Sequence, residues 1–205
     1  MSANKSDALS IVESYKAIRQ KLLAVFGEHT GCRVFCVTSP ATSEGKTTTA
    51  INVAIAFSQL GKRVLLIDGD MHRGSVHKKL RLSSLYGLCD LLSESCDLSS
   101  AIVSAGSSLD VIVAGAPKDD AEALLSSESF ENLLSGLKYV YDYIIIDTPS
   151  VCEYKDAVSV AARTDGAVLV LREGVSLHKK ISAAFAMLQS AGVNLLGTVM
   201  NGAKR

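Results

Sequence analysis

The sequence of 205 residues lacks net charge, a long apolar run and a signal-peptide core. Lys+Arg and Asp+Glu both number 21, so bulk charge does not draw the chain to nucleic acid or to anionic lipid. No run reaches the roughly 18 apolar residues that a membrane-spanning helix requires. Residues 1–7 are polar, and no signal-peptide core follows them. These absences predict a cytoplasmic protein with no nucleic-acid partner, which reaches the inner face of the plasma membrane only through another protein.

Cysteines are few, and their pattern excludes a zinc site. They number five and are scattered along the chain, at Cys32, Cys36, Cys89, Cys96 and Cys152. No second Cys/His pair completes a zinc-binding set, so we expect reduced thiols that pack in the interior. A chain of this length fits one α/β domain with a sizeable core and needs no second domain.

One segment predicts nucleotide binding. Residues 40–47 have the sequence Pro-Ala-Thr-Ser-Glu-Gly-Lys-Thr and lie between an apolar run at 34–38 and a helical stretch at 50–56. A triphosphate requires converging backbone N–H groups, a helix N-terminus, a lysine for the outer phosphates and a hydroxyl for Mg²⁺. We assign these parts to Ser43, Glu44, Gly45, Lys46, Thr47 and Thr48. A chance Gly-Lys-Thr is the alternative, and the flanking strand and helix argue against it.

The start of this loop departs from the usual motif. Pro40 stands where the first glycine is expected, and proline has no N–H and a fixed φ. The loop must therefore begin in a different conformation.

Short apolar runs rich in β-formers alternate with longer helical segments. We expect strands at 33–38, 63–68, 109–114, 143–148, 166–171 and 195–201. Helices are expected at 7–26, 47–60, 121–137, 155–162 and 177–191. Continuous apolar strands indicate burial on both faces, as in a parallel sheet covered by helices. The pattern predicts the α/β fold of a P-loop NTPase, a doubly wound, mostly parallel sheet with helices on both faces and ligands at the carboxyl ends of the strands.

Carboxylates follow two of these strands. Asp68 and Asp70 come directly after the apolar run 64–67, at the edge where Mg²⁺ and a phosphoryl acceptor need oxygen ligands or a base. A strand-terminal Asp can also simply cap a turn, but two of them in a P-loop protein favour catalysis. Asp147 closes the apolar strand 143–146 in a Walker B pattern, and its carboxylate is expected to hold the Mg²⁺ water shell opposite Thr47.

Asn201 ends the last expected strand. Its amide suits a hydrogen bond to the adenine edge, and its position before Gly202 suits a turn. The sequence leaves both interpretations open. With it, the candidate site comprises the catalytic residues Lys46, Asp68, Asp70 and Asp147 and the magnesium ligands Thr47, Asp68 and Asp147.

Taken together, residues 37–50, 61–70 and 141–149 resemble the bacterial tyrosine kinases of capsule and exopolysaccharide synthesis. The segments 87–92 and 122–127 are similar to further motifs of that family, so the resemblance spans nearly the whole chain. It implies transfer of the γ-phosphate of ATP to tyrosine with Mg²⁺ as cofactor, in the control of polysaccharide synthesis or export. It also implies a partner, the cytoplasmic tail of a membrane chain-length or adaptor protein.

The leading helix, within residues 1–30, has two interpretations. Its apolar positions form a helical stripe (Ile11, Tyr15, Ile18, Leu22 and Phe26) that would dock on the ATP-binding kinase domain, residues 31–205. Its residues Glu13, Lys16 and Arg19 resemble a family motif that closes a ring of subunits, with Lys16 in place of an arginine. The resemblance implies a homo-oligomer through this helix, weakened because lysine lacks the bidentate geometry of arginine.

Three features depart from the family pattern. Residues 71–74 replace a usual Leu-Arg-Arg-Pro and bring in His72, and Ser43 stands at a common glycine position, which is expected to stiffen the phosphate loop. The family ends in a tyrosine cluster, whereas all six tyrosines here precede residue 155 and the chain ends at Arg205. Either the tail is truncated or the acceptor tyrosine lies on another protein.

Two other functions compete with kinase activity. ParA/MinD-type positioning ATPases share these motifs but carry a lysine where Ala41 stands, and the expected C-terminal membrane helix is missing here. A nucleotide-binding assembly or regulatory subunit without tyrosine phosphotransfer is the second alternative. The sequence identifies neither the acceptor nor the polysaccharide pathway.

Overall fold

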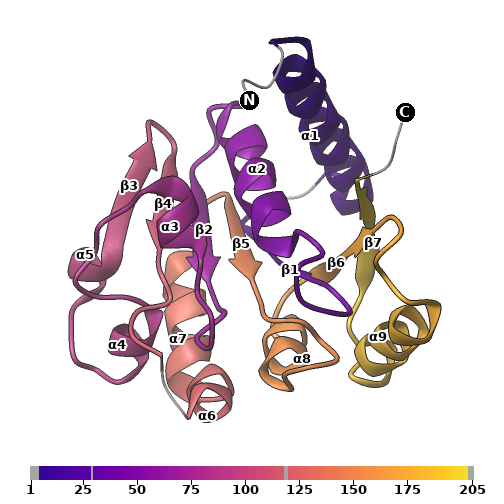
Figure 1. Ribbon diagram of the computed structural model, residues 1–205. Coiled ribbons are helices and arrows are strands. Elements are labelled where there is room, and N and C mark those ends of the chain that lie inside the picture. The colour runs from indigo at the N-terminus through magenta and orange to yellow at the C-terminus, as the bar shows by residue number, and fades with distance from the viewer. Residues whose placement is uncertain (1–4, 29, 118–119, 203–205) are drawn as a thin grey trace.

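A seven-stranded sheet forms the centre of the computed structural model, which describes residues 5–28, 30–117 and 120–202 (Figure 1). The strand order is β3-β4-β2-β5-β1-β6-β7. All neighbouring strands are parallel except the antiparallel pair β3–β4. The strands are β1 (Arg33–Thr38), β2 (Val64–Asp68), β3 (Ile102–Gly106), β4 (Leu109–Ile112), β5 (Tyr143–Asp147), β6 (Gly166–Arg172) and β7 (Leu195–Asn201).

Helices cover both faces of this sheet, so the predicted doubly wound α/β fold is confirmed. On one face lie α1 and α2, and on the other lie α4, α6, α7, α8 and α9 (Figure 1). The helices are α1 (Lys5–Phe26), α2 (Lys46–Ser58), α3 (Val76–Leu80), α4 (Leu88–Leu92), α5 (Leu98–Ala101), α6 (Ala121–Leu125), α7 (Glu128–Leu137), α8 (Asp156–Ala161) and α9 (His178–Ser190).

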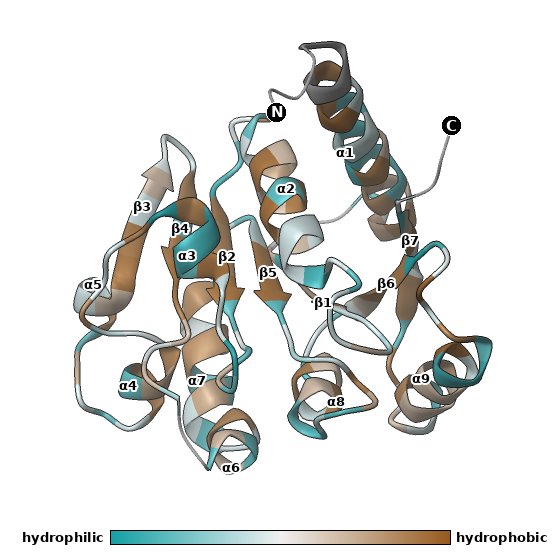
Figure 2. Cartoon of the chain, in the orientation of Figure 1, coloured by the Kyte–Doolittle hydropathy of each residue, from teal (hydrophilic) through white to brown (hydrophobic). Residues whose placement is uncertain are grey.

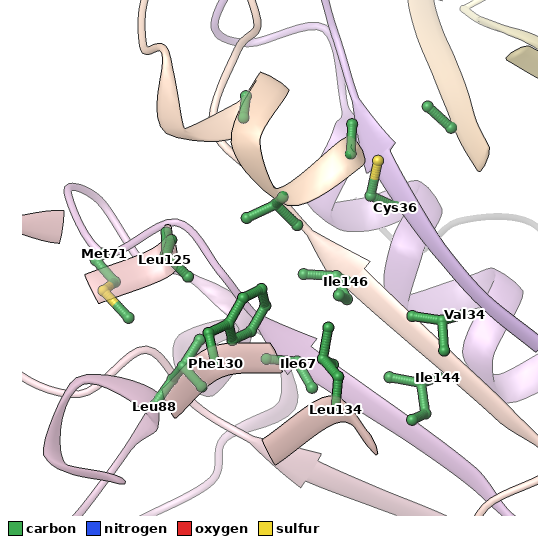
Figure 3. Packing of buried hydrophobic residues seen from close by; sticks show 14 of the residues in the cluster. Val34, Cys36, Ile67, Met71, Leu88, Leu125, Phe130, Leu134, Ile144 and Ile146 are labelled. Atoms are coloured by element: carbon green, nitrogen blue, oxygen red, sulfur yellow. The ribbon is translucent and has the colours of Figure 1, made fainter. Parts of the chain in front are cut away.

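The side chains of the central strands divide between two cores. In β1, Val34 and Cys36 join Ile144, Ile146 and the helices of one face (Figure 3). The alternate positions of the same strand face α1 and α2, because successive strand side chains point to opposite faces. Both sets are buried, and the central strands are correspondingly hydrophobic along their length in Figure 2. The expected burial on both faces is confirmed.

Several elements differ from the expectation. The expected helix at 121–137 is interrupted at Ser126 and Ser127, and Ser127 caps α7 by accepting a hydrogen bond from the N–H of Phe130 at 3.3 Å. The short helices α3, α4 and α5 were missed because four or five residues carry too little periodicity. β3 was missed because three of its five residues are exposed at the sheet edge, which leaves no continuous apolar run. Cys36 and Cys89 are buried, as expected, whereas Cys32, Cys96 and Cys152 are only partly buried.

The helix α1 packs on the same core as the rest of the chain. Leu22 is buried, and Tyr15, Ile18 and Phe26 pack against the core, but Ile11 is 52% exposed, so the expected stripe is shorter than predicted. The guanidinium Nη1 of Arg19 donates to the carbonyl of Ala56 in α2 at 2.6 Å. Arg19 therefore contributes to the docking of α1 on its own chain, and its part in a contact between subunits stays a prediction.

The other two charged residues of that expected contact pair with each other. Lys16 Nζ lies 2.8 Å from Glu13 Oε1, within one turn of α1. Both side chains are largely solvated, and such a pair contributes only about 0–1 kcal/mol. A homo-oligomer through the helix that carries Glu13, Lys16 and Arg19 stays a prediction.

Gly87 marks a close approach between backbones. A Cβ at this position would lie 2.5 Å from the carbonyl oxygen of Val113 and from the Cα of Gly115. The same carbonyl accepts a hydrogen bond from the N–H of Leu88 at 2.7 Å. The start of α4 is thus fixed against the end of β4, and only glycine fits there.

We expect Gly87→Ala to destabilise the fold by about 1–3 kcal/mol, because the added methyl group must displace backbone rather than a flexible side chain. Gly136→Ala is the matched control: it lies in α7 with open space around its Cβ position, and alanine should stabilise the helix by about 0.5–1 kcal/mol. Urea unfolding of both variants measures the difference. Equal stability of the two variants would contradict the close approach at Gly87.

Candidate functional site

The candidate site lies where the carboxyl ends of β1, β2 and β5 meet the start of α2. The loop between β1 and α2 encloses a cavity of about 360 Å³. The expected residues that line this cavity are Ser43, Gly45, Lys46, Thr47, Thr48 and Asp70. Arg73, Ser75 and Lys79, from the segment that follows β2, line it as well and were not assigned to the site from the sequence.

Two residues of the phosphate loop adopt left-handed backbone conformations. Gly45 has φ +96°, and a Cβ there would overlap the amide Nδ2 of Asn201. Ser43 has φ +65°, a conformation that glycine adopts at little cost and serine does not. Stiffening of the loop by Ser43 stays a prediction, and the strained backbone at this residue supports it.

Asn201 lies against the phosphate loop at the end of β7. Its Nδ2 donates to the carbonyl of Glu44 at 3.0 Å and lies 3.4 Å from the hydroxyl of Thr49. A second hollow beside the loop is lined by Asn201 together with Arg172 and Thr48. Asn201 therefore supports the loop, and its contact with adenine stays a prediction.

The carboxylate of Glu44 braces the loop from within. It accepts hydrogen bonds from the N–H of Ala41 at 2.9 Å and from the hydroxyl of Ser176, and the residue is 1% exposed. Pro40 has no N–H, and the next residue, Ala41, is the one that donates to Glu44. The carboxylate of Glu44 is thus occupied, and any contact of this residue with a phosphate must come from its backbone N–H.

Lys46 forms a partly buried ion pair with Asp70. Its Nζ lies 2.9 Å from Asp70 Oδ2, and the two side chains are 12% and 9% exposed. The other oxygen of Asp70 accepts a hydrogen bond from the N–H of Arg73 at 2.9 Å. Asp70 therefore orients the cationic end of Lys46 and fixes the chain that follows β2.

Asp68 also holds that segment in place. Its Oδ2 accepts from the N–H of Val76 at 3.0 Å, and its Oδ1 accepts from the N–H of Asp70 at 3.3 Å. The turn-capping interpretation is correct as far as it goes, because Asp68 does cap the start of α3. Each oxygen still has a further lone pair available.

Asp147 lies beside Asp68 across the sheet. The two residues are register partners in β2 and β5, and the N–H of Gly69 donates to the carbonyl of Asp147 at 2.7 Å. Both carboxylate oxygens of Asp147 are buried and lack a hydrogen-bond partner among the described residues. Such orphaned acceptors are costly unless a ligand meets them.

These orphaned oxygens fit a hydrated magnesium ion. Magnesium is usually bound through one or two carboxylates, several waters and substrate phosphates rather than by a complete protein cage. Within the described part of the chain, no three His, Cys, Asp or Glu residues form a ready metal cluster. A magnesium site formed by Thr47, Asp68 and Asp147 stays a prediction.

The three carboxylates outnumber the one lysine among them. Burial raises the pKa of Asp147 to about 7, although Lys46 and Thr47 oppose the change. Burial likewise raises the pKa of Asp68 to about 6, with backbone hydrogen bonds opposing it and Asp70 reinforcing it. Burial alone would lower the pKa of Lys46, but the carboxylates of Asp147, Asp70 and Asp68 raise it overall. The site is short of positive charge.

Further contacts around the loop were not foreseen from the sequence. Arg172 Nη1 donates to the carbonyl of Ser43 at 3.0 Å, and Glu153 Oε1 accepts from the N–H of Thr42 at 3.2 Å. Arg172 is the last residue of β6 and Glu153 follows β5, over a hundred positions from the loop, and no local motif marks them.

His72, singled out as a departure from the family pattern, ties two loops together. Its Nε2 lies 2.8 Å from Oδ2 of Asp156, which is 1% exposed. Its ring stacks on that of Tyr154, with centroids 4.0 Å apart. The segment after β2 is thus joined to the start of α8, so His72 has a clear structural role beside the site.

Comparison with known proteins agrees with this geometry. The family model of the AAA domain matches residues 33–170. The chain is 35% identical over 169 residues to the tyrosine-protein kinase YwqD of Bacillus subtilis, which covers 82% of this chain and 71% of that protein. It is 37% identical over 172 residues to the tyrosine-protein kinase CpsD of Streptococcus pneumoniae, at 82% and 75% coverage.

A solved structure shows the same fold. The kinase domain of the Escherichia coli tyrosine kinase ETK superposes with a TM-score of 0.87 at 30% identity, covering 95% of this chain and 78% of that one. Sequence and structure lead to one conclusion: the chain belongs to the bacterial tyrosine kinase family that its motifs resemble.

Proposed function

We propose that this chain is an ATP-dependent protein-tyrosine kinase that acts in capsule or exopolysaccharide synthesis. The observation that carries the proposal is the convergence of four charged side chains at one edge of the sheet, beside the cavity that the phosphate loop lines. These side chains are Lys46, Asp68, Asp70 and Asp147. ATP is the phosphoryl donor, and Mg²⁺ is the cofactor whose ligands would be Thr47, Asp68 and Asp147. Membership of the tyrosine kinase family supports tyrosine as the acceptor.

Each part of the site has a role in binding the triphosphate. The N–H groups of the loop and the start of α2 suit the phosphate oxygens, and Lys46 suits the outer phosphates. Magnesium, when bound, supplies positive charge that offsets the charge on the phosphates. Asp147 suits the water shell of that ion because its buried oxygens have no other described partner. Positioning and charge neutralisation contribute most of the catalysis in phosphoryl transfer.

The transfer itself requires a base near neutral pH. The tyrosine oxygen forms a bond to the γ-phosphorus, the bond from that phosphorus to the β,γ-bridging oxygen breaks, and ADP leaves. The proton of the tyrosine hydroxyl passes to a carboxylate. Asp68 suits this step, because its pKa of about 6 lies near working pH, and Asp70 holds the neighbouring Lys46 in place.

A membrane partner of the kind implied by the family resemblance would bring this kinase to a membrane pathway. Within the described residues, no helix has both the length and the apolarity to cross a bilayer. We propose a cytoplasmic location, with recruitment to the inner face of the plasma membrane by the cytoplasmic tail of a chain-length or adaptor protein. A homo-oligomer through the helix that carries Glu13, Lys16 and Arg19 belongs to the same proposal, and light scattering over a salt series tests it.

Lys46→Met should abolish phosphotransfer from radiolabelled ATP to tyrosine peptides, because the outer phosphates lose their counter-charge. Its melting temperature should fall as well, since Asp70 loses its ion-pair partner.

Asp68→Asn should bind a non-hydrolysable ATP analogue nearly as well as the wild type but transfer phosphate far more slowly. Wild-type transfer in either variant would contradict the assignment. ATP hydrolysis without transfer to any peptide would instead identify the regulatory ATPase.

A second prediction concerns pH. The folded-state pKa of Asp147, about 7, lies above the ordinary value of 3.8. The stabilising effect of its protonation is therefore fully present below pH 3.8 and is lost as pH rises towards 7. Asp147→Asn should accordingly stabilise the nucleotide-free protein at pH 8, on the order of 2 kcal/mol, with a smaller gain at pH 4. Urea unfolding at both pH values measures it, and destabilisation at pH 8 would contradict the charge balance described here.

The partner proposal also has a direct test. The isolated chain should phosphorylate tyrosine only weakly. A peptide with the cytoplasmic tail sequence of the membrane adaptor encoded beside this chain should raise the rate of phosphorylation severalfold. A scrambled tail peptide is the control. Full activity of the isolated chain, unchanged by the tail, would contradict the need for an adaptor.

A further inference from the structure

A run of basic side chains follows the catalytic carboxylates Asp68 and Asp70. Residues 71–89 contain four Lys and Arg residues and no Asp or Glu, although the whole chain carries 21 of each charge. The four are Arg73, Lys78, Lys79 and Arg81, which we call the basic segment. All four are exposed, and none forms an ion pair with a described carboxylate. Figure 2 shows α3, the helix within this run, as hydrophilic.

The basic segment is held directly at the candidate site. Arg73 and Lys79 line the same cavity as Lys46 and Thr47. The backbone N–H of Arg73 donates to Asp70 at 2.9 Å, and the N–H of Val76 donates to Asp68 at 3.0 Å. The backbone that carries the basic side chains is therefore held in place beside Asp68 and Asp70.

Two of the four charges lie outside the lining of that cavity. Lys78 and Arg81 are exposed but do not line it, so the phosphates of ATP do not account for them. Arg81 is also the residue after α3, with φ +55°, a left-handed position that normally favours glycine or asparagine. A charged side chain thus occupies a strained position on the rim, where an incoming molecule would meet it.

We infer that the basic segment binds acidic residues flanking the acceptor tyrosine, so that this kinase selects acidic tyrosine peptides. The inference rests on the proposed kinase function and names its substrate class. The acceptor must reach the cavity, and the basic segment is continuous with the cavity wall on its outer side. Like charges repel a basic peptide there, so the surface discriminates as well as attracts.

The test uses the whole chain with a non-hydrolysable ATP analogue and Mg²⁺. Fluorescence anisotropy measures the Kd of three labelled tyrosine peptides, flanked by Glu, by Ser or by Lys. The variant Lys78→Glu with Arg81→Glu should raise the Kd of the Glu-flanked peptide about tenfold, since each exposed charge contact contributes modestly. Its Kd for the Ser-flanked peptide and for the ATP analogue should stay within twofold of the wild type.

A matched control carries the same change of charge elsewhere. Lys62 and Lys138 are exposed and precede β2 and β5, at the opposite end of the sheet. Lys62→Glu with Lys138→Glu should leave all three peptide affinities unchanged. An equal loss of affinity in both double variants would overturn the inference, because it would reflect net charge alone. Equal wild-type affinity for the Glu-flanked and Ser-flanked peptides would overturn it too.

Two further outcomes would also overturn it. If the Lys78/Arg81 variant loses affinity for the ATP analogue, the basic segment serves the nucleotide. If it loses binding to phosphatidylserine vesicles while peptide affinity stays constant, the partner is an anionic membrane. Because binding is measured without phosphotransfer, absence of transfer to every peptide would count against the kinase function, whereas selective acidic-peptide binding would still support the substrate class.

Discussion

The electrostatic imbalance among Lys46, Asp68, Asp70 and Asp147 is the constraint on which the site depends. Three carboxylates and one ammonium group are brought together with little water around them, and a buried charge is stable only when it is paired. The raised pKa values of Asp68 and Asp147 show that burial disfavours the charged forms of both carboxyl groups. A divalent cation would offset the same excess of negative charge without protons.

The sheet makes this arrangement possible. Asp68 and Asp147 are neighbours because β2 and β5 pair in parallel register, residue against residue, up to their last positions. The strands are long apolar runs buried between two helical layers, and a shift of register would expose them. Lys46 reaches the same point because α2 begins there, immediately after the loop that follows β1. Hydrophobic packing thus positions charges that would otherwise repel.

Sequence patterns predicted what is local and missed what the topology brings together. The phosphate loop was recognisable because Gly45, Lys46 and Thr47 are consecutive, and the two strand-terminal aspartates because apolar runs precede them. Arg172 and Glu153, which brace the loop, lie more than a hundred residues from it in sequence. The hydrogen bond from Arg19 to α2 of its own chain was not foreseen either, because the two partners lie 37 residues apart in sequence. Short elements such as α3 lie below the length at which periodicity is informative.

The same short segment separates the two signs of charge. Its backbone N–H groups face Asp68 and Asp70, while its basic side chains point outward or line the cavity. The acidic interior therefore lies behind a basic rim in a chain whose net charge is zero. Exposed basic side chains act on an approaching peptide within a Debye length of about 8–10 Å. One surface can then attract acidic acceptors while the centre remains able to take a proton, and this separation depends on backbone hydrogen bonds rather than on sequence charge.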